Sequence, residues 1–335
     1  METAIGHPES ERRPARRVLL GSLRELSLLP AIVVVFIVGY NSSPAFFTTA
    51  NLSNTAQASA ALGMVVVAET LVLLTANLDL SLQSIFGFAP AVGAWLVVDK
   101  GGHGLGTQWS PWLGIAIVLT VGAVIGLFNG VMIVKLRFNG FIFTLALLIS
   151  LAGLQQGLAS DQSLYNMPET FIYLGNAYWL GFPVSGWVTL AVFLVVGLFL
   201  RYHRAGRGVY AIGGNLEAAR AAGIKVDRVR IGVFCVAGLL AAIGGLMTAG
   251  QVATITANQG NNLIFQVFAA AVIGGIALEG GRGRMVGAFT GVVLLGLVQN
   301  VLVLRNTSTY WIDFAYGSII LLALGLQRIS SAIRA

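Results

Sequence analysis

The sequence predicts an all-α, polytopic transmembrane helical bundle of about ten transmembrane helices with both termini cytoplasmic, and three observations lead to that prediction. First, 56% of the 335 residues are hydrophobic and only 10% are charged, whereas soluble proteins carry about 25% charged residues. Second, the apolar residues gather in runs close to the roughly 20 residues that cross a bilayer. Third, the basic residues fall almost entirely on one side of the topology that these runs imply.

The apolar runs fix the order of the expected helices. Three of them, 26–40, 84–98 and 185–200, are short for a full crossing, so they are re-entrant, tilted or wrongly bounded. In chain order the ten runs are 26–40, 54–76, 84–98, 112–134, 138–159, 185–200, 231–252, 263–279, 285–304 and 310–327. We therefore expect a basic cytoplasmic tail over 1–25, one transmembrane domain over 26–329 and a cytoplasmic tail over 330–335.

Charge placement tests this topology independently of hydropathy. With the N-terminus inside and a change of side at each run, 18 of the 20 Lys and Arg residues lie inside, and only Lys100 and Arg305 lie outside. The outer loop 160–184 contains Asp161 and Glu169 but no basic residue. The tail lacks the apolar region and cleavage site of a signal peptide. The basic pI of 9.9 therefore indicates the inner rim of a membrane protein, and we expect no nucleic-acid partner.

Small residues recur at four-residue spacing inside two of the runs. Gly122, Gly126 and Gly130 form one such series, and Gly287 and Gly291 form another. This spacing places the glycines on one helix face, where it lets two backbones approach closely. We expect these faces to pack inside the bundle.

Two stretches on the inner side interrupt the apolar pattern. LLTANLDLSLQS, 73–84, contains Asp79 and Ser81, and IGGIALEGGRGR, 273–284, has paired glycines around Glu279. Each joins an inward-running helix to an outward-running one and can mark the end of a discontinuous helix. Asp79 has two interpretations: a cap for the helix that begins near Ser81, which ordinary helix energetics favour, or a buried functional carboxylate.

Polar side chains inside the runs are candidates for a translocation path. Glu69 lies deepest, and a lone carboxylate in a membrane span is a functional candidate by default, although it can also be protonated or bonded to a neighbouring helix. Neutral amides suit a neutral, hydroxyl-rich solute, and each can equally bond helix to helix. The amide candidates are Asn77, Asn129, Asn139, Gln155 and Asn300.

Patterns for enzymatic chemistry are missing from the sequence. His7, His103 and His203 have no second His or Cys at metal-ligand spacing. No GxSxG, HExxH or GxxxxGK[ST] motif occurs. We therefore expect no catalytic residue, no metal site and no cofactor bound by this chain, which cannot hydrolyse ATP by the P-loop route on its own.

The longest inner loop, 201–230, contains a short, soluble helix. Asn215 can cap it, 216–222 can make about two turns, and Gly223 can end it. A helix of two turns is too short to be stable alone, so we expect it to dock. Physical reasoning leaves a partner's groove and the chain's own bundle or the lipid headgroups equally open as its docking site.

Three segments together carry a resemblance to a known family. YAIGGNLEAARAAGIKVDRVRI, 210–231, resembles the inner loop of the ribose/xylose-type permeases of bacterial ABC importers. GMVVVAETLVLLTANLDLSLQS, 63–84, is similar to their TLVILTGGIDLSVGS segment. AAVIGGIALEGGRGRMVGAFTGVVLLGLVQNVL, 270–302, resembles their segment built around GGRG. The matches run in order over about residues 60 to 327.

The resemblance implies a permease subunit without an ATPase of its own. Its implied partners are two cytoplasmic ATP-binding subunits, which hold the ATP, an extracytoplasmic solute-binding protein, a second permease copy or a homologous permease, and membrane lipid. It also implies that the capped helix is a coupling helix that docks in the ATPase, through Asn215, Glu217, Ala218, Ala219 and Gly223. The turn motifs carried over are Asp79, Leu80 and Ser81 in one segment and Gly280, Gly281, Arg282 and Gly283 in the other.

The sequence departs from the family pattern in two places. Ala76, Asn77 and Gln83 replace its glycines, and Glu279 stands where a small polar residue is usual. Pentoses, hexoses, polyols and furanosyl signalling molecules all stay open as cargo, with branched-chain amino acids and nucleosides as alternatives. Two other classes are an ion-gradient-driven secondary transporter that uses Glu69 or Asp79 as its coupling carboxylate, and a membrane receptor or scaffold without transport. The outer loops 41–53, 99–111, 160–184 and 253–262 are expected to meet the binding protein.

Overall fold

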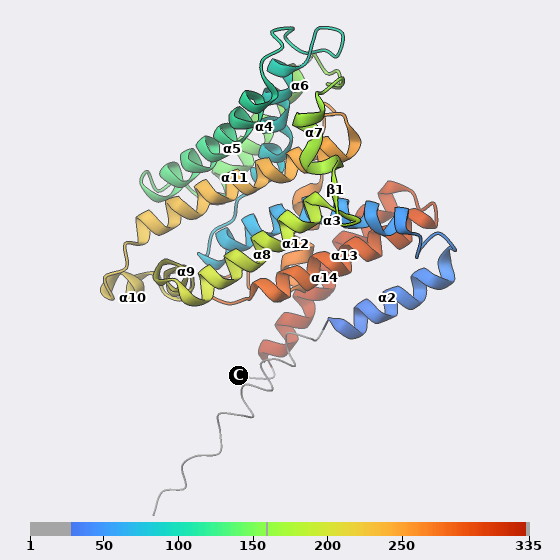
Figure 1. Ribbon diagram of the computed structural model, residues 1–335. Coiled ribbons are helices and arrows are strands. Elements are labelled where there is room, and N and C mark those ends of the chain that lie inside the picture. Colours follow the sequence, from blue (N-terminus) through green and yellow to red (C-terminus); the bar gives the residue numbers. More distant parts are fainter. Residues whose placement is uncertain (1–27, 159, 333–335) are drawn as a thin grey trace, which may run out of the picture.

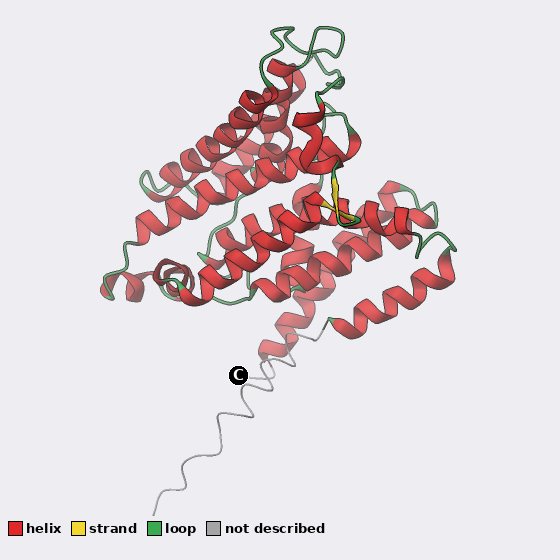
Figure 2. Cartoon of the chain, viewed as in Figure 1, coloured by secondary structure: helices red, strands yellow, loops and turns green. Residues whose placement is uncertain are grey.

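The computed structural model describes residues 28–158 and 160–332, so the expected N-terminal tail lies outside the described residues, as do 333–335 (Figure 1). Helices dominate the described part, and its only strands are two short ones (Figure 2). The helices are α2 (Leu29–Ser42), α3 (Thr49–Leu74), α4 (Leu82–Val97), α5 (Pro111–Val134), α6 (Gly140–Leu158), α7 (Glu169–Asn176), α8 (Val184–Tyr202), α9 (Arg204–Gly214), α10 (Leu216–Ala221), α11 (Val226–Val252), α12 (Leu263–Ile273), α13 (Met285–Leu304) and α14 (Thr309–Ala332). The strands β1 (Tyr178–Trp179) and β2 (Phe182–Pro183) pair antiparallel.

Six helices in the described ranges are long and apolar enough to cross a membrane, namely α3, α5, α6, α8, α11 and α13. The all-α membrane architecture is therefore confirmed. Each of the ten expected runs contains a helix, but α2 has 14 residues, α4 has 16 and α12 has 11. These three are too short to be counted as spans by length alone.

Two of the expected runs have different bounds in the structure. The run 185–200 looked short, but α8 extends it to 19 residues and makes it a candidate span. The run 263–279 is helical only as far as Ile273. Its last third is apolar but turns, because Gly275 has a positive φ of 79° and an added Cβ on Gly274 would overlap the carbonyl oxygen of Gly287. Hydropathy alone could not distinguish this turn from a continuing helix.

The centre of the bundle is formed by α3 and α11. The most apolar stretch of α3 is 89% buried within the chain, whereas that of α6 is 17% buried. α11 packs along both α3 and α5, and Figure 1 shows α5 and α11 lying side by side. Since lipid is as apolar as the side chains that face it, the outward faces of α5, α6 and α8 stay apolar without being covered by protein.

The glycine series do pack inside the chain, as predicted. A Cβ added to Gly126 would overlap the carbonyl oxygen of Phe234, so α5 lies directly against the backbone of α11 there. A Cβ added to Gly291 would overlap the carbonyl oxygen of Ala270, which places α13 equally close to α12. Only glycine allows two helices to approach in this way.

The two ends of α8 carry different structures. α9 and α10 follow its C-terminal end, while α7 and the β1–β2 hairpin precede its N-terminal end (Figure 1). α8 is a candidate span, so the predicted topology places these two groups on opposite sides of the membrane. The end of the bundle that carries α10 also contains the turns between α3 and α4 and between α12 and α13, as the contacts below show.

The expected outer loop 253–262 folds back into the protein over part of its length. Ile255 pairs with Leu164 through two backbone hydrogen bonds of 2.9 Å and is almost fully buried. The Gln259 amide donates to the carbonyl oxygens of Phe86 and Gly245, each at 3.2 Å. These contacts tie the loop to Leu164, to α4 and to α11, and its expected contact with the binding protein stays a prediction.

Candidate functional site at the α10 end of the bundle

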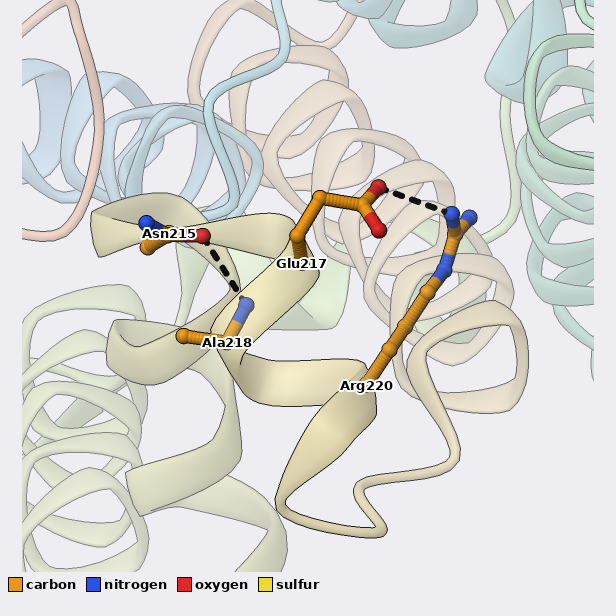
Figure 3. Close-up of polar contacts among 4 residues, drawn as sticks. All are labelled: Asn215, Glu217, Ala218 and Arg220. Carbon is orange, nitrogen blue, oxygen red and sulfur yellow. Dashed lines mark hydrogen bonds and ion pairs between the residues drawn. The ribbon is translucent and has the colours of Figure 1, made fainter.

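α10 begins as the sequence predicted. The Oδ1 atom of Asn215 accepts a hydrogen bond of 2.9 Å from the backbone N–H of Ala218, which caps the helix (Figure 3). Glu217 and Arg220 form an ion pair of 3.2 Å on the exposed surface of the helix. Such exposed pairs contribute little stability. Gly223 follows the helix with a positive φ of 77°, the conformation that ends helices at glycine.

A small apolar core packs against the inner face of α10. Ile212 from α9, Ala219 from α10 and Val226 from the start of α11 are buried together, and Leu216 and Ile224 pack against them. Ala219 therefore faces the chain's own core. Glu217, Ala218, Ala221 and Ala222 remain exposed on the other side. The predicted coupling residues thus separate into an inward one, Ala219, and outward ones.

α9 packs directly against the two turns that interrupt the apolar pattern, the turn after α3 and the turn after α12. A Cβ on Gly213 would overlap the Leu74 carbonyl oxygen and lie 2.5 Å from the Gly281 amide nitrogen. The Gly281 N–H donates a hydrogen bond of 3.1 Å to the Leu74 carbonyl oxygen. One turn earlier in α9, the Tyr210 hydroxyl donates to the carbonyl oxygen of Gly283 at 2.9 Å. Burial raises the pKa of Tyr210, so this donor stays protonated. We call Leu74, Tyr210, Gly213, Gly281 and Gly283 the α9 junction.

The GGRG turn depends on backbone conformations that favour glycine. Gly280, Gly281 and Gly283 all have positive φ, and a Cβ on Gly280 would lie 2.7 Å from the backbone nitrogen of Ala76. Arg282 is exposed, as is Glu279. The turn between α12 and α13 is thereby pressed against the end of α3 and against α9.

The turn after α3 is held by a buried polar cluster. Oδ1 of Asp79 accepts hydrogen bonds from the backbone N–H (3.0 Å) and hydroxyl (2.6 Å) of Ser81, and Oδ2 accepts one from the Asn129 amide at 3.0 Å. That amide also donates to the Ser81 hydroxyl at 2.8 Å. Asp79 thus bonds the backbone just before α4, as a cap would, and also joins α5. The N-cap of α4 is Ser81, which makes no side-chain cap hydrogen bond, so Asp79 stabilises the turn before the helix, and its functional interpretation stays a prediction. Leu80, half-buried beside it, donates its backbone N–H to the Thr144 hydroxyl.

Glu69 completes this cluster from within α3. It is fully buried, and its Oε1 atom accepts a long hydrogen bond of 3.5 Å from the backbone N–H of Asp79. Its Oε2 atom and the Oδ1 atom of Asn129 have no hydrogen-bond partner in the described part of the chain. Two carboxyl groups therefore share one apolar region, where buried acceptors are costly unless they are paired.

The other polar candidates have separate positions. Asn77 accepts a hydrogen bond of 2.5 Å from Arg230, which ties the turn after α3 to α11. Asn139 is exposed and caps α6, accepting from the Ile142 N–H at 3.1 Å. Gln155 is buried and donates to the carbonyl oxygens of Thr256 and Gln259.

Asn300 forms a reciprocal amide pair with Asn51, with hydrogen bonds of 2.7 and 3.0 Å. Only Glu69, Asp79, Ser81 and Asn129 are therefore brought together in one site. The contacts of the remaining amides join one part of the chain to another.

Sequence reasoning did not identify Tyr210, Gly213 or Arg230 as part of the site. Tyr210 and Gly213 lie in the quoted YAIGG stretch, shortly before Asn215, but Gly283 and Gly281 lie far along the chain from them and Leu74 lies far before them. The available signal was two adjacent glycines, Gly213 and Gly214, in a helix that would be more stable without them. Such glycines indicate a close backbone approach.

A family model described as "Branched-chain amino acid transport system / permease component" matches residues 51–324, most of the chain. The chain belongs to this permease family. Together with the six candidate spans, membership makes it a multi-pass protein of the bacterial inner membrane. It is a permease subunit of an ABC importer, and the ion-gradient transporter and the scaffold are disfavoured.

Individual relatives of the permease cover nearly its whole length. It is 33% identical to the ribose import permease protein RbsC of Escherichia coli (strain K12) over 306 residues, which are 90% of this chain and 92% of the relative. It is 36% identical to the autoinducer 2 import system permease protein LsrC of Klebsiella pneumoniae over 305 residues, 91% and 86% of the two chains. The L-arabinose ABC transporter permease protein AraH of Azospirillum brasilense is 32% identical over 321 residues, 95% and 92%.

Proposed function

We propose that this permease moves a small, neutral, hydroxyl-rich solute, a sugar or a sugar-like molecule, into the cell. The observation that carries the proposal is the similarity over about nine tenths of the chain to import permeases for ribose and L-arabinose. The buried Asn129 amide, whose Oδ1 atom has no hydrogen-bond partner among the described residues, agrees with such a cargo, because amides bond hydroxyl groups without demanding a charge. We propose that the cluster of Glu69, Asp79, Ser81 and Asn129 and the amide Gln155 contribute polar groups to the path of the solute.

The proposed partners supply the energy and the solute. Two ATP-binding subunits bind and hydrolyse ATP on the cytoplasmic side, so this chain needs no cofactor of its own. A solute-binding protein delivers cargo on the other side, and a second permease copy or a homologous permease completes the path. The proposed orientation has ten crossings, both termini in the cytoplasm and α10 facing the ATPase.

The proposed mechanism runs through the α9 junction. The exposed face of α10 docks in the ATPase, and closure of the ATPase pair displaces α10. Since α9 contacts both Leu74 and Gly281 without intervening side chains, the displacement reaches the turn after α3 and the turn after α12 together. The bundle then changes between outward-open and inward-open conformations, whose balance the partners shift.

Reconstitution tests the proposal directly. The permease, its cognate ATPase and its cognate binding protein are placed in proteoliposomes, and uptake of radiolabelled ribose, L-arabinose and leucine is measured with and without ATP. We expect uptake of a sugar that requires both ATP and the binding protein. Sugar uptake driven by a proton or sodium gradient without ATP would contradict it.

Branched-chain amino acids are the second candidate cargo, because the description of the matching family names their transport. The same assay distinguishes the two. ATP-dependent uptake of leucine without uptake of either sugar would keep the ABC mechanism and replace the cargo.

A further inference from the structure

The hairpin between α7 and α8 has an unusual tip. β1 and β2 are joined by the two residues Leu180 and Gly181, and both have positive φ, 54° and 77°. Hairpin turns with two positive φ values normally use Asn, Asp or Gly, since other side chains are strained in this conformation. Here a leucine occupies the first of the two positions. Its side chain is 96% exposed within the chain.

Local turn energetics do not explain this leucine. Asparagine at the same position would relieve the backbone strain and be better hydrated in water. An apolar side chain that is strained, fully exposed and at the tip of a turn therefore indicates a surface that covers it.

The hairpin is surrounded by aromatic side chains, and both tryptophan indole N–H groups among them donate hydrogen bonds within the chain. Tyr173, Tyr178, Trp179 and Trp187 are each between 42% and 52% exposed. The Trp179 indole N–H donates to the Tyr173 hydroxyl at 2.8 Å, and the Trp187 indole N–H donates to the Trp179 carbonyl oxygen at 3.2 Å. Paired polar groups of this kind lower the cost of contact with an apolar medium.

The aromatic group continues an apolar stripe along α8. Trp187, Leu190, Leu194 and Leu198 are exposed at helical spacing on one face of this candidate span. No charged residue occurs between Glu169 and Arg201. The stripe therefore leads from the lipid-facing surface of α8 onto the hairpin without interruption. Tryptophan and tyrosine are enriched at the level where a membrane meets water.

We propose that the hairpin 178–183 is a membrane anchor, with Leu180 inserted among lipids at the interface on the side opposite α10. The continuous apolar stripe and the lack of charge favour lipid over a protein partner, whose contact would be expected at the charged part of the same loop. The loop 160–184 then has two functions. Its first part, which contains Asp161 and Glu169, faces water, and its second part holds the N-terminal end of α8 in the membrane.

Site-specific quenching tests the anchor. In a Cys235→Ala background, Leu180→Cys is labelled with an environment-sensitive fluorophore, and the full-length permease is reconstituted in phosphatidylcholine vesicles with or without brominated acyl chains. Glu169→Cys, in the same loop, is the matched control. We expect brominated lipid to quench the label at 180 at least about twofold more than the label at 169, and aqueous iodide to show the opposite order. Equal iodide quenching at both positions would overturn the proposal.

A second measurement separates lipid from a protein partner. Addition of the cargo-loaded binding protein should leave the emission at 180 unchanged. Protection of the label at 180 from iodide only when that protein is present would show that the tip is a docking surface instead.

Leu180→Asn isolates the role of the leucine, because asparagine tolerates the turn conformation. With a label at Tyr178→Cys, we expect Leu180→Asn to lower the quenching by brominated lipid about twofold while the protein still folds. Unchanged quenching would overturn the role of Leu180.

Discussion

α9 and α10 are neighbouring helices in one loop, of 11 and 6 residues, and both are rich in small residues, yet the structure uses them differently. α9 is pressed against the backbone of two other segments through Gly213, and Tyr210 bonds a third position. α10 buries Ala219, packs Leu216 partly against the same core and leaves its other residues exposed. The difference shows that small residues serve two purposes here. In α9 they allow close packing, and in α10 the alanines Ala218 and Ala221 lie on an exposed surface, where we propose that the ATPase docks.

The largest expected effect belongs to α9. Gly213→Ala would force a methyl group against the Leu74 carbonyl oxygen, and overpacking of this kind costs about 1–3 kcal/mol or more. We expect loss of uptake and a lower melting temperature of the purified permease. Gly214→Ala is the matched control, since nothing lies within 4 Å of an added Cβ there. A comparable loss of uptake and of melting temperature in both variants would show that the effect does not come from the close packing of α9 at Gly213.

The next effect distinguishes the two faces of α10. Ala218→Asp adds a charge to the exposed face of α10. Disruption at the centre of an interface costs about 2 kcal/mol or more of binding free energy, which lowers the affinity for the ATPase by more than about tenfold. We expect uptake and ATPase binding to fall while the melting temperature stays unchanged. Ala219→Asp should instead lower the melting temperature, because it buries a carboxylate in the small core. Normal ATPase binding by Ala218→Asp would remove this face from the interface.

The smallest effect tests the hydrogen bond of the α9 junction. Tyr210→Phe removes the donor to Gly283, and a hydrogen bond of this kind contributes about 1 kcal/mol. Burial raises the pKa of Tyr210 above its ordinary value near 10. Its contribution to stability is therefore constant at neutral pH and is lost only as the pH rises beyond that value. Melting curves of both proteins from neutral to mildly alkaline pH should differ by a constant amount. A difference that changes across neutral pH would contradict this assignment.

Most of the fold could be predicted from the sequence, because the bilayer imposes the length and the polarity of each helix. The cap at Asn215 and the end at Gly223 follow from short-range chemistry and were predicted correctly. The end of α12 at Ile273 was not, since apolar composition continues through a turn that depends on contact with Gly287.

The candidate site was less predictable. A six-residue helix that is half alanine has no apolar pattern to show which face is inward, so the burial of Ala219 required the structure. The Asp79–Asn129 and Tyr210–Gly283 contacts join residues 50 and 73 positions apart. Such pairings depend on tertiary packing, and single-sequence patterns do not contain them.

The burial of α3 has a consequence for biogenesis. α3 emerges from the ribosome long before α11, yet α11 supplies much of the protein surface around it. Until α11 has been synthesised, the face of α3 around Ala61 and Met64 lacks the close backbone contact that Gly244 of α11 makes there. Truncations that end before α11 should consequently be degraded in the cell instead of accumulating as stable fragments.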